Sequence, residues 1–279
     1  MDQADMLPAF PRDLNVDIRL DDDPRYIGTI HDDSVARARG YKAALIPGAF
    51  VYGHISRVAL QAWGEAWTIR GGMGARFLRP VYNGDRILFR VGMLEGGAAM
   101  RRAEVSVINE DGAEVASGWV GLPDAAPVVP DISAFTLIPR PEAPPVVSVG
   151  SLHPDTPLTT ANRVLTQSDF EASLRSFGES EAFYESEDIV HSGCIMRLAM
   201  GDAHNSFRFP SPVVLTDIET QHFAQVRPGQ RLATVGRVAQ VYQRKGKHYL
   251  ETEEFLLADG LLVARFVRTQ IYAYDMPRS

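Results

Sequence analysis

The chain has 279 residues, a length that suits one large domain or two of ordinary size. Hydrophobic residues make up 45% and charged residues 23%, which is typical of a globular protein with a sizeable core. The formal net charge of −7 argues against a dedicated nucleic-acid binder, although an anionic small ligand needs only a few local Lys and Arg. A single cysteine, Cys194, excludes an internal disulfide and a multi-cysteine metal site.

The chain shows neither a positive start followed by an apolar core nor an apolar run of about 18 residues. We therefore expect a cytoplasmic protein that carries no secretory signal and does not cross a membrane.

The first periodic segment predicts a mostly buried helix from Ala49 to Trp67, because its apolar residues recur at helical spacing. β-like runs follow at residues 87–91, 103–107 and 115–121, and turn pairs between them predict hairpins. The strongly polar members of the helix fall on one narrow stripe: His54, Arg57, Gln61 and Glu65.

A proline-rich segment then divides the chain into near-equal halves. Proline fixes the backbone and removes donors, so this segment predicts an extended connector. We expect an N-terminal domain at residues 1–124, a linker at 125–157 and a C-terminal domain at 158–279.

The second half repeats the landmarks of the first in the same order. Gly193 corresponds to Gly48 at an offset of 145 residues (193 − 48), and residues 226–231 correspond to residues 81–86 at the same offset. The pair Asp259-Gly260 follows Asp111-Gly112 at an offset of 148 (259 − 111). A helix at 194–203 and strands at 231–242, 248–257 and 261–274 complete the second copy. A duplicated domain is the simplest cause.

One buried helix followed by an antiparallel meander is the pattern of a hotdog domain. We predict an α+β double hotdog, in which each long helix is wrapped by a curled antiparallel sheet and two fused copies lie side by side.

Several short segments resemble the MaoC-like hydratase/dehydratase family, in particular its tandem double-hotdog members. They are residues 30–40, 44–48, 76–85, 190–193 and 242–248. The resemblance implies (R)-specific hydration or dehydration of an acyl thioester, usually on coenzyme A. It implies no cofactor beyond the coenzyme A of the substrate, no metal and no nucleic-acid partner; a homodimer is the commonest assembly.

The family's active loop carries an Asp, four residues and then a His. Here His31 stands at the His position and Tyr26 at the Asp position. In the second half Glu179 corresponds to the Asp and Tyr184 to the His. Neither half therefore keeps the full pair.

Hydration of an enoyl thioester needs an acid/base group and donors for charge that develops on the thioester oxygen. His31 suits the first role. Tyr26 could donate to a ligand, or it could equally be a packed aromatic at a strand edge. Gly48 suits the second, because a helix N-terminus directs N–H groups at negative charge; it could equally be a tight turn. Asp33 could orient His31, but Asp-Asp-Ser before residues 35–38 also predicts a helix N-cap at Asp33.

In the second half, Glu179 and Tyr184 could form an altered site. The alternative is a solvated acidic loop that also contains Glu181 and Glu185. His191 is more often a satisfied buried histidine than a catalyst or substrate-binding residue.

A basic turn contains Arg244, Lys245 and Lys247. These side chains could bind the phosphates of coenzyme A, or the segment could be a solvated hairpin turn.

Four functions remain open at this point. The first is a hydratase or dehydratase that uses His31 and the Gly48 amide. The others are a thioesterase-like hydrolase that uses Glu179, a non-catalytic acyl-binding module, and a specialised lyase or cyclase in a repurposed pocket. The sequence has no Gly-rich phosphate loop, paired metal-ligand motif or Gly-x-Ser-x-Gly elbow, which argues against an NTPase, a metalloenzyme and a serine hydrolase.

Overall fold

The computed structural model describes residues 13–275 except 22, 98, 180 and 211. The two chain ends that we assigned to the outer limits of the domains therefore lie outside the described residues.

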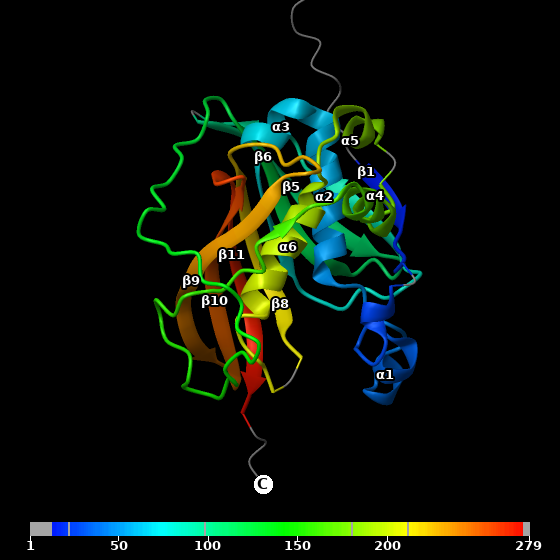
Figure 1. Cartoon of the computed structure of the whole chain (residues 1–279). Coiled ribbons are helices and arrows are strands. Elements are labelled where there is room, and N and C mark those ends of the chain that lie inside the picture. Colours follow the sequence, from blue (N-terminus) through cyan, green and yellow to red (C-terminus); the bar gives the residue numbers. More distant parts are fainter. Residues whose placement is uncertain (1–12, 22, 98, 180, 211, 276–279) are drawn as a thin grey trace, which may run out of the picture.

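Within these residues, one sheet of 11 strands runs through both halves of the chain (Figure 1). The strands of the first half are β1 (Asp13–Asp17), β2 (Gly72–Phe77), β3 (Arg86–Val91), β4 (Glu95–Gly96), β5 (Met100–Asn109) and β6 (Glu114–Pro123). Those of the second half are β7 (Arg163–Val164), β8 (Val214–His222), β9 (Arg231–Arg244), β10 (Lys247–Ala258) and β11 (Leu261–Tyr274).

The strand order is β1-β3-β5-β6-β2-β8-β11-β10-β9-β7, with β4 paired to β5. It reads the same from either end when each strand of one half is matched to its counterpart in the other. The centre is the antiparallel pair β2–β8, registered from Gly72 opposite Gln221 to Arg76 opposite Asp217. The predicted hairpin turns lie at equivalent places, Asp111-Gly112 between β5 and β6 and Asp259-Gly260 between β10 and β11. The duplication inferred from sequence is thus visible as pseudo-two-fold symmetry.

The two hotdog helices, α2 and α6, pack against each other inside the curved sheet (Figure 1). A single core cluster includes buried residues of both helices and of both halves of the sheet. The helices, including the short 3-10 helix η1, are η1 (Pro24–Tyr26), α1 (Asp33–Ala38), α2 (Gly48–Trp63), α3 (Glu65–Arg70), α4 (Gln167–Ser176), α5 (Ala182–Glu187) and α6 (Ser192–His204). The fold is a double hotdog, as predicted.

The helix that we predicted from Ala49 to Trp67 is interrupted. Gly64 ends α2 with φ +52° and ψ −136°, a conformation open essentially to glycine alone, and α3 begins at the next residue. The apolar spacing continues across the break, and for that reason periodicity alone did not reveal it.

The polar stripe of α2 faces the other half of the molecule. His54 is buried, and Arg57 pairs with Glu179 and Glu181 of the second half. Gln61 also donates to Glu181, at 2.7 Å. The polar side chains therefore link the two halves.

Residues 124–162 connect the halves; they contain no helix or strand, but isolated bridges and hydrogen bonds hold them against the second half. Val147, Leu152 and Leu158 join a small core with Phe207 and Tyr272.

A buried carboxylate fastens the connector to α6. The Asp202 side chain, 3% exposed, accepts hydrogen bonds from Arg140 at 2.9 Å and from Arg163 at 2.7 Å. Thr160 and Thr234 donate to its other oxygen. The connector is therefore held by specific contacts as well as by apolar packing.

None of the helices in the described ranges is both long and apolar enough to span a lipid bilayer.

Candidate active site

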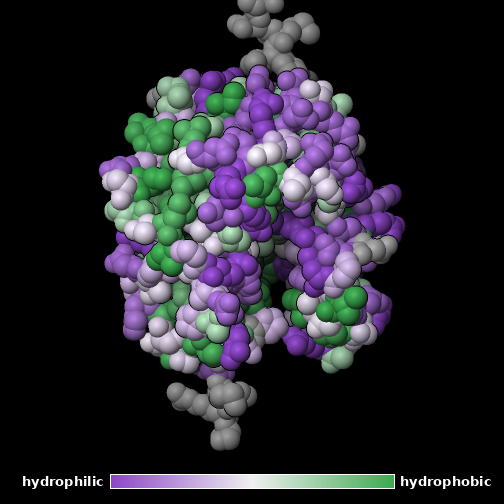
Figure 2. Space-filling model, in the orientation of Figure 1, coloured by the Kyte–Doolittle hydropathy of each residue, from purple (hydrophilic) through white to green (hydrophobic). Residues whose placement is uncertain are grey.

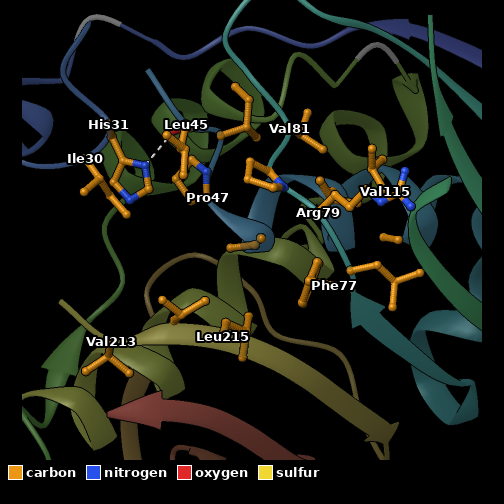
Figure 3. A pocket seen from close by; sticks show the side chains of 18 of the residues that line it. Ile30, His31, Leu45, Pro47, Phe77, Arg79, Val81, Val115, Val213 and Leu215 are labelled. Atoms are coloured by element: carbon orange, nitrogen blue, oxygen red, sulfur yellow. Dashed lines mark hydrogen bonds between the residues drawn. The ribbon is translucent and has the colours of Figure 1, made fainter. Parts of the chain in front are cut away.

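A cavity of about 310 Å³ opens where the first half meets the start of β8. Figure 3 shows His31, Leu45 and Pro47 of the first half on one side, with Val213 and Leu215 of the second half opposite. In Figure 2 the surface is hollowed between the lobe that carries α1 and the main body. The walls are mostly apolar, and the lining residues with polar side chains are His31, Tyr41 and Arg79. Such a cavity suits a ligand with an apolar body and few polar groups.

The N-terminus of α2 borders the cavity. Pro47 and Gly48 both line it, and the helix has no side-chain cap. Among the described residues no acceptor is found for the N–H of Gly48. A Cβ at this position would lie 3.1 Å from the Phe77 ring, closer than an ordinary van der Waals contact, so glycine lets the ring pack against the helix end. The helix end therefore offers free N–H groups and positive partial charge to a ligand carbonyl.

His31 lines the same cavity. Its Nδ1 lies 2.6 Å from the carbonyl oxygen of Leu45, so this nitrogen carries the proton and Nε2 is left as an acceptor. Burial lowers the pKa of His31; the hydrogen bond to Leu45 opposes this, and the charges of Arg25 and Arg197 lower the pKa further. The imidazole is therefore neutral near pH 7 and can accept a proton.

Tyr26 and Asp33 line a neighbouring hollow of about 380 Å³ on the other side of His31. The Tyr26 ring meets the His31 ring edge-on, with centroids 5.6 Å apart, and its hydroxyl accepts a hydrogen bond from Arg25. Burial raises the pKa of Tyr26, so the phenol stays protonated.

Asp33 has a structural role that differs from the predicted N-cap. The cap of α1 is Asp32, whose side chain accepts from the Ser34 N–H, and Asp33 is the first helical residue. One oxygen of Asp33 accepts from the Ala44 N–H at 2.7 Å and the other pairs with Arg37. Asp33 thus ties α1 to the segment that leads into α2.

The corresponding position of the second half is filled by protein. His191 caps α6, its Nδ1 accepting from the Gly193 N–H at 3.0 Å. Phe177 stacks on His191, and a Cβ on Gly193 would lie 2.5 Å from the Phe177 ring. The N–H that is free at Gly48 is therefore already bonded at Gly193, and side chains occupy the space in front of it.

Glu179 is buried and paired, which corrects the interpretation of this segment as a solvated acidic loop. Its side chain is 3% exposed, with oxygens 3.3 Å from His191 Nε2 and 3.5 Å from Arg57 Nε. It also accepts from the Glu181 N–H at 2.8 Å. Burial opposes ionisation, but these partners outweigh it and hold the pKa of the Glu179 carboxyl below its usual value. Glu185, by contrast, is exposed as predicted.

Tyr184 is fully buried beside His191, with ring centroids 4.9 Å apart. Burial and the charge of Glu179 raise the pKa of its hydroxyl, so it stays protonated. Glu179, Tyr184 and His191 thus form one cluster, but none of them lines the cavity that contains His31 and Gly48.

The basic turn is an exposed hairpin between β9 and β10. Lys245 and Gly246 have φ of +50° and +72°, the conformation of a tight two-residue turn. Lys247 lies opposite Tyr274 of β11 in the sheet. Three residues earlier in β11, Ile271 lies opposite Val214, which lines the cavity, so the hairpin and the cavity are at the same end of the sheet. Arg244, Lys245 and Lys247 themselves do not line it.

Sequence reasoning missed Arg197, which lies in α6 and whose charge reaches both Tyr26 and His31. The signal that could have found it is a charged residue within an otherwise apolar stretch of the hotdog helix.

Comparisons with known proteins show the fold. No family model matches the chain, and no curated protein matches it in sequence. Among solved structures, a MaoC-like dehydratase is 12% identical with a TM-score of 0.59, covering 93% of this chain and 97% of that one. A conserved hypothetical protein from Mycobacterium tuberculosis with a double hotdog fold is 15% identical (TM-score 0.56; 88% and 89%). A 12:0-ACP thioesterase from Umbellularia californica is 7% identical (TM-score 0.52; 92% and 96%). The chain therefore has the fold of MaoC-like dehydratases, and at these identities the likeness extends to thioesterases as well.

Proposed function

We propose that this protein is a hydratase or dehydratase of acyl thioesters, with its active site in the first half of the chain. The observation that carries the proposal is one apolar cavity that holds both a neutral imidazole and an uncapped helix N-terminus. These are the two groups that addition of water to an enoyl thioester requires.

In the proposed reaction the thioester carbonyl oxygen lies at the N–H of Gly48. His31 Nε2 takes a proton from water, and the water oxygen bonds to the third carbon of the acyl group. The double-bond electrons move toward the carbonyl, whose developing negative charge is stabilised by the α2 N-terminus. The imidazolium then returns the proton to the second carbon. Dehydration is the same sequence reversed.

Tyr26 replaces the carboxylate that the family places in this loop. With its pKa raised it cannot act as the base, so the acid/base cycle falls to His31 alone. The phenol lines the neighbouring hollow and accepts from Arg25, so it contacts the His31 ring rather than a ligand in the cavity. We therefore expect turnover to be about 10²–10⁴-fold slower than an Asp/His pair would support, because one acid/base group is missing.

The contacts in the second half argue for a structural role of Glu179. A base or nucleophile needs access to substrate, whereas Glu179 is 3% exposed and paired with His191 and Arg57. This arrangement gives no support to a thioesterase mechanism at that carboxylate.

The carrier of the acyl group is proposed to be coenzyme A. The exposed cations Arg244, Lys245 and Lys247 lie at the same end of the sheet as the cavity, where they could bind phosphate without entering it. Their neutralisation should raise KM with little effect on kcat.

The test uses a panel of enoyl-CoA and 3-hydroxyacyl-CoA thioesters, followed by enoyl absorbance and by free thiol. We expect loss of enoyl absorbance without thiol release, and a decrease of at least about 100-fold in His31→Gln. His153→Gln is the matched control, because His153 is an exposed histidine in the connector.

Thiol release that survives His31→Gln would contradict the proposal in favour of a hydrolase. Inactivity of the wild type toward every thioester would contradict it outright.

A further inference from the structure

We infer that the acyl group turned over at this site carries a second carboxylate, which binds Arg197. The inference rests on the proposed function and narrows its substrate class to thioesters of dicarboxylic acids.

Arg197 is half-buried between aromatic rings. Its guanidinium carbon lies 5.3 Å from the ring centroid of Phe50 and 5.8 Å from that of Phe177. Aromatic faces attract a cation but do not replace the hydrogen-bond acceptors that a guanidinium loses on burial. Its donors therefore remain available.

No hydrogen bond or ion pair of Arg197 is present within the described part of the chain. Asp21, the carboxylate whose charge acts on Arg197, is shared with a neighbouring cation. Arg25 lies 3.7 Å from Asp21 and 3.1 Å from Asp23. Asp21 also accepts a short hydrogen bond from Ser176. Among the described residues of this cluster, Arg25 forms ion pairs with both carboxylates, whereas Asp21 acts on Arg197 only through its charge.

Arg197 does not itself line the cavity, but it lies close to the N-terminus of α2. Phe50, over which it lies, belongs to the first turn of α2, two residues after Gly48. Met200, one turn further along the same face of α6, lines the cavity. An acyl group whose carbonyl lies at Gly48 can therefore bring a short chain end toward Arg197.

The electrostatics of the neighbours agree with this placement. Burial and the charge of Arg25 lower the pKa of Arg197, although Tyr26, Cys194 and Asp21 oppose this. The charge of Arg197 in turn contributes to the lowered pKa of His31 and partly offsets the rise that burial causes in the pKa of Tyr26. A bound carboxylate would relieve this repulsion and form charge-assisted, bidentate hydrogen bonds with the guanidinium.

The chemistry of the counterpart position is different. At the 145-residue offset, Tyr52 of α2 corresponds to Arg197, and its hydroxyl donates to Thr220 and lies 3.3 Å from Ser192. Tyr52 of α2 thus has its partners within the protein, whereas its counterpart Arg197 of α6 is left for a ligand.

The decisive experiment compares two substrates of equal chain length, trans-3-carboxyacryloyl-CoA and crotonyl-CoA, which differ by a carboxylate in place of a methyl group. For the wild type we expect kcat/KM to be about 10- to 100-fold higher for the carboxylated substrate, as a hydrogen-bonded charge pair implies. Arg197→Met should bring the ratio of the two kcat/KM values to near one, and Arg197→Lys should restore part of it.

Arg175→Met is the matched control, since Arg175 is an exposed arginine of α4. Its ratio should equal that of the wild type. Thermal unfolding of each variant shows whether it is folded, and binding of trans-3-carboxyacryloyl-CoA by calorimetry gives a readout independent of turnover.

The experiment distinguishes failure of the carboxylate inference from failure of the hydratase proposal. Turnover of both substrates with equal kcat/KM would overturn the carboxylate inference and leave the hydratase proposal intact. Binding that depends on Arg197 without turnover of either substrate would overturn the hydratase proposal and support the carboxylate site. A ratio that Arg197→Met leaves unchanged would overturn the role of Arg197.

Discussion

Replacement of Glu179 by Gln tests whether this buried carboxylate supports the fold or the chemistry. The substitution keeps the shape and the acceptor for the Glu181 N–H, but it removes the charge that faces His191 at 3.3 Å and Arg57 at 3.5 Å. Removing one partner of a buried pair destabilises by about 3–5 kcal/mol; the retained hydrogen bond reduces this to about 2–4 kcal/mol. For a chain of this size the melting temperature should fall by roughly 5–10 °C.

The loss should depend on pH. The pKa of Glu179 is held below its usual value in the folded state, so its stabilisation is present above the unfolded pKa and is lost as pH falls through the folded one. Chemical denaturation of wild type and Glu179→Gln at several pH values should therefore show a difference in unfolding free energy that is full at neutral pH and shrinks in acid. Glu185→Gln, an exposed control in α5, should change stability by less than about 0.5 kcal/mol.

Activity completes the test. At a temperature where the variant is folded, we expect Glu179→Gln to retain the hydration rate of the wild type. A variant of unchanged stability with abolished turnover would refute the structural role and return Glu179 to the candidates for catalysis.

Three further predictions concern packing, the connector and titration. Gly193→Ala should destabilise by about 1–3 kcal/mol in denaturant titrations, because its Cβ would lie 2.5 Å from the Phe177 ring; full stability would show that the ring moves freely. Asp202→Ala should destabilise by about 3–5 kcal/mol and make the connector sensitive to proteolysis, since it leaves two arginines without their shared carboxylate; unchanged cleavage would contradict the fastening role. The pKa of His31, measured by NMR of its ring protons, should lie below 6.5. It should rise in Arg197→Met, because removal of a positive charge favours the imidazolium. An unchanged pKa would show that the Arg197 guanidinium is too far from His31 to affect its titration.

The long strands of the second half were predictable because β-like runs are separated by turn pairs such as Asp259-Gly260. The predicted strand at residues 261–274 coincides with β11 (Leu261–Tyr274). The two central strands were missed. β2 is rich in glycine, and Gly74 is required because a Cβ there would lie 2.3 Å from Trp119 Nε1, a contact that local propensity does not encode.

The site was predictable to a similar degree. His31 and Gly48 were chosen from sequence, and the structure brings both to one cavity, although their roles stay predictions. The burial of Glu179 was not predictable, because its partner Arg57 is 122 residues away in the chain and the surrounding loop is acidic. Arg197 stands out in sequence as a charged residue of the second hotdog helix, but its position beside Phe50 of the other half could not be predicted from the sequence.

The palindromic strand order also bears on how such a site can change over time. In a homodimer a single gene specifies both pockets, so every substitution appears twice and each must be tolerated in both places. Fusion of two copies removes that constraint. Phe177 and His191 can fill one pocket as packing while the other stays open. The two copies can then accumulate different substitutions, one copy under selection for stability and the other for the ligand that it binds.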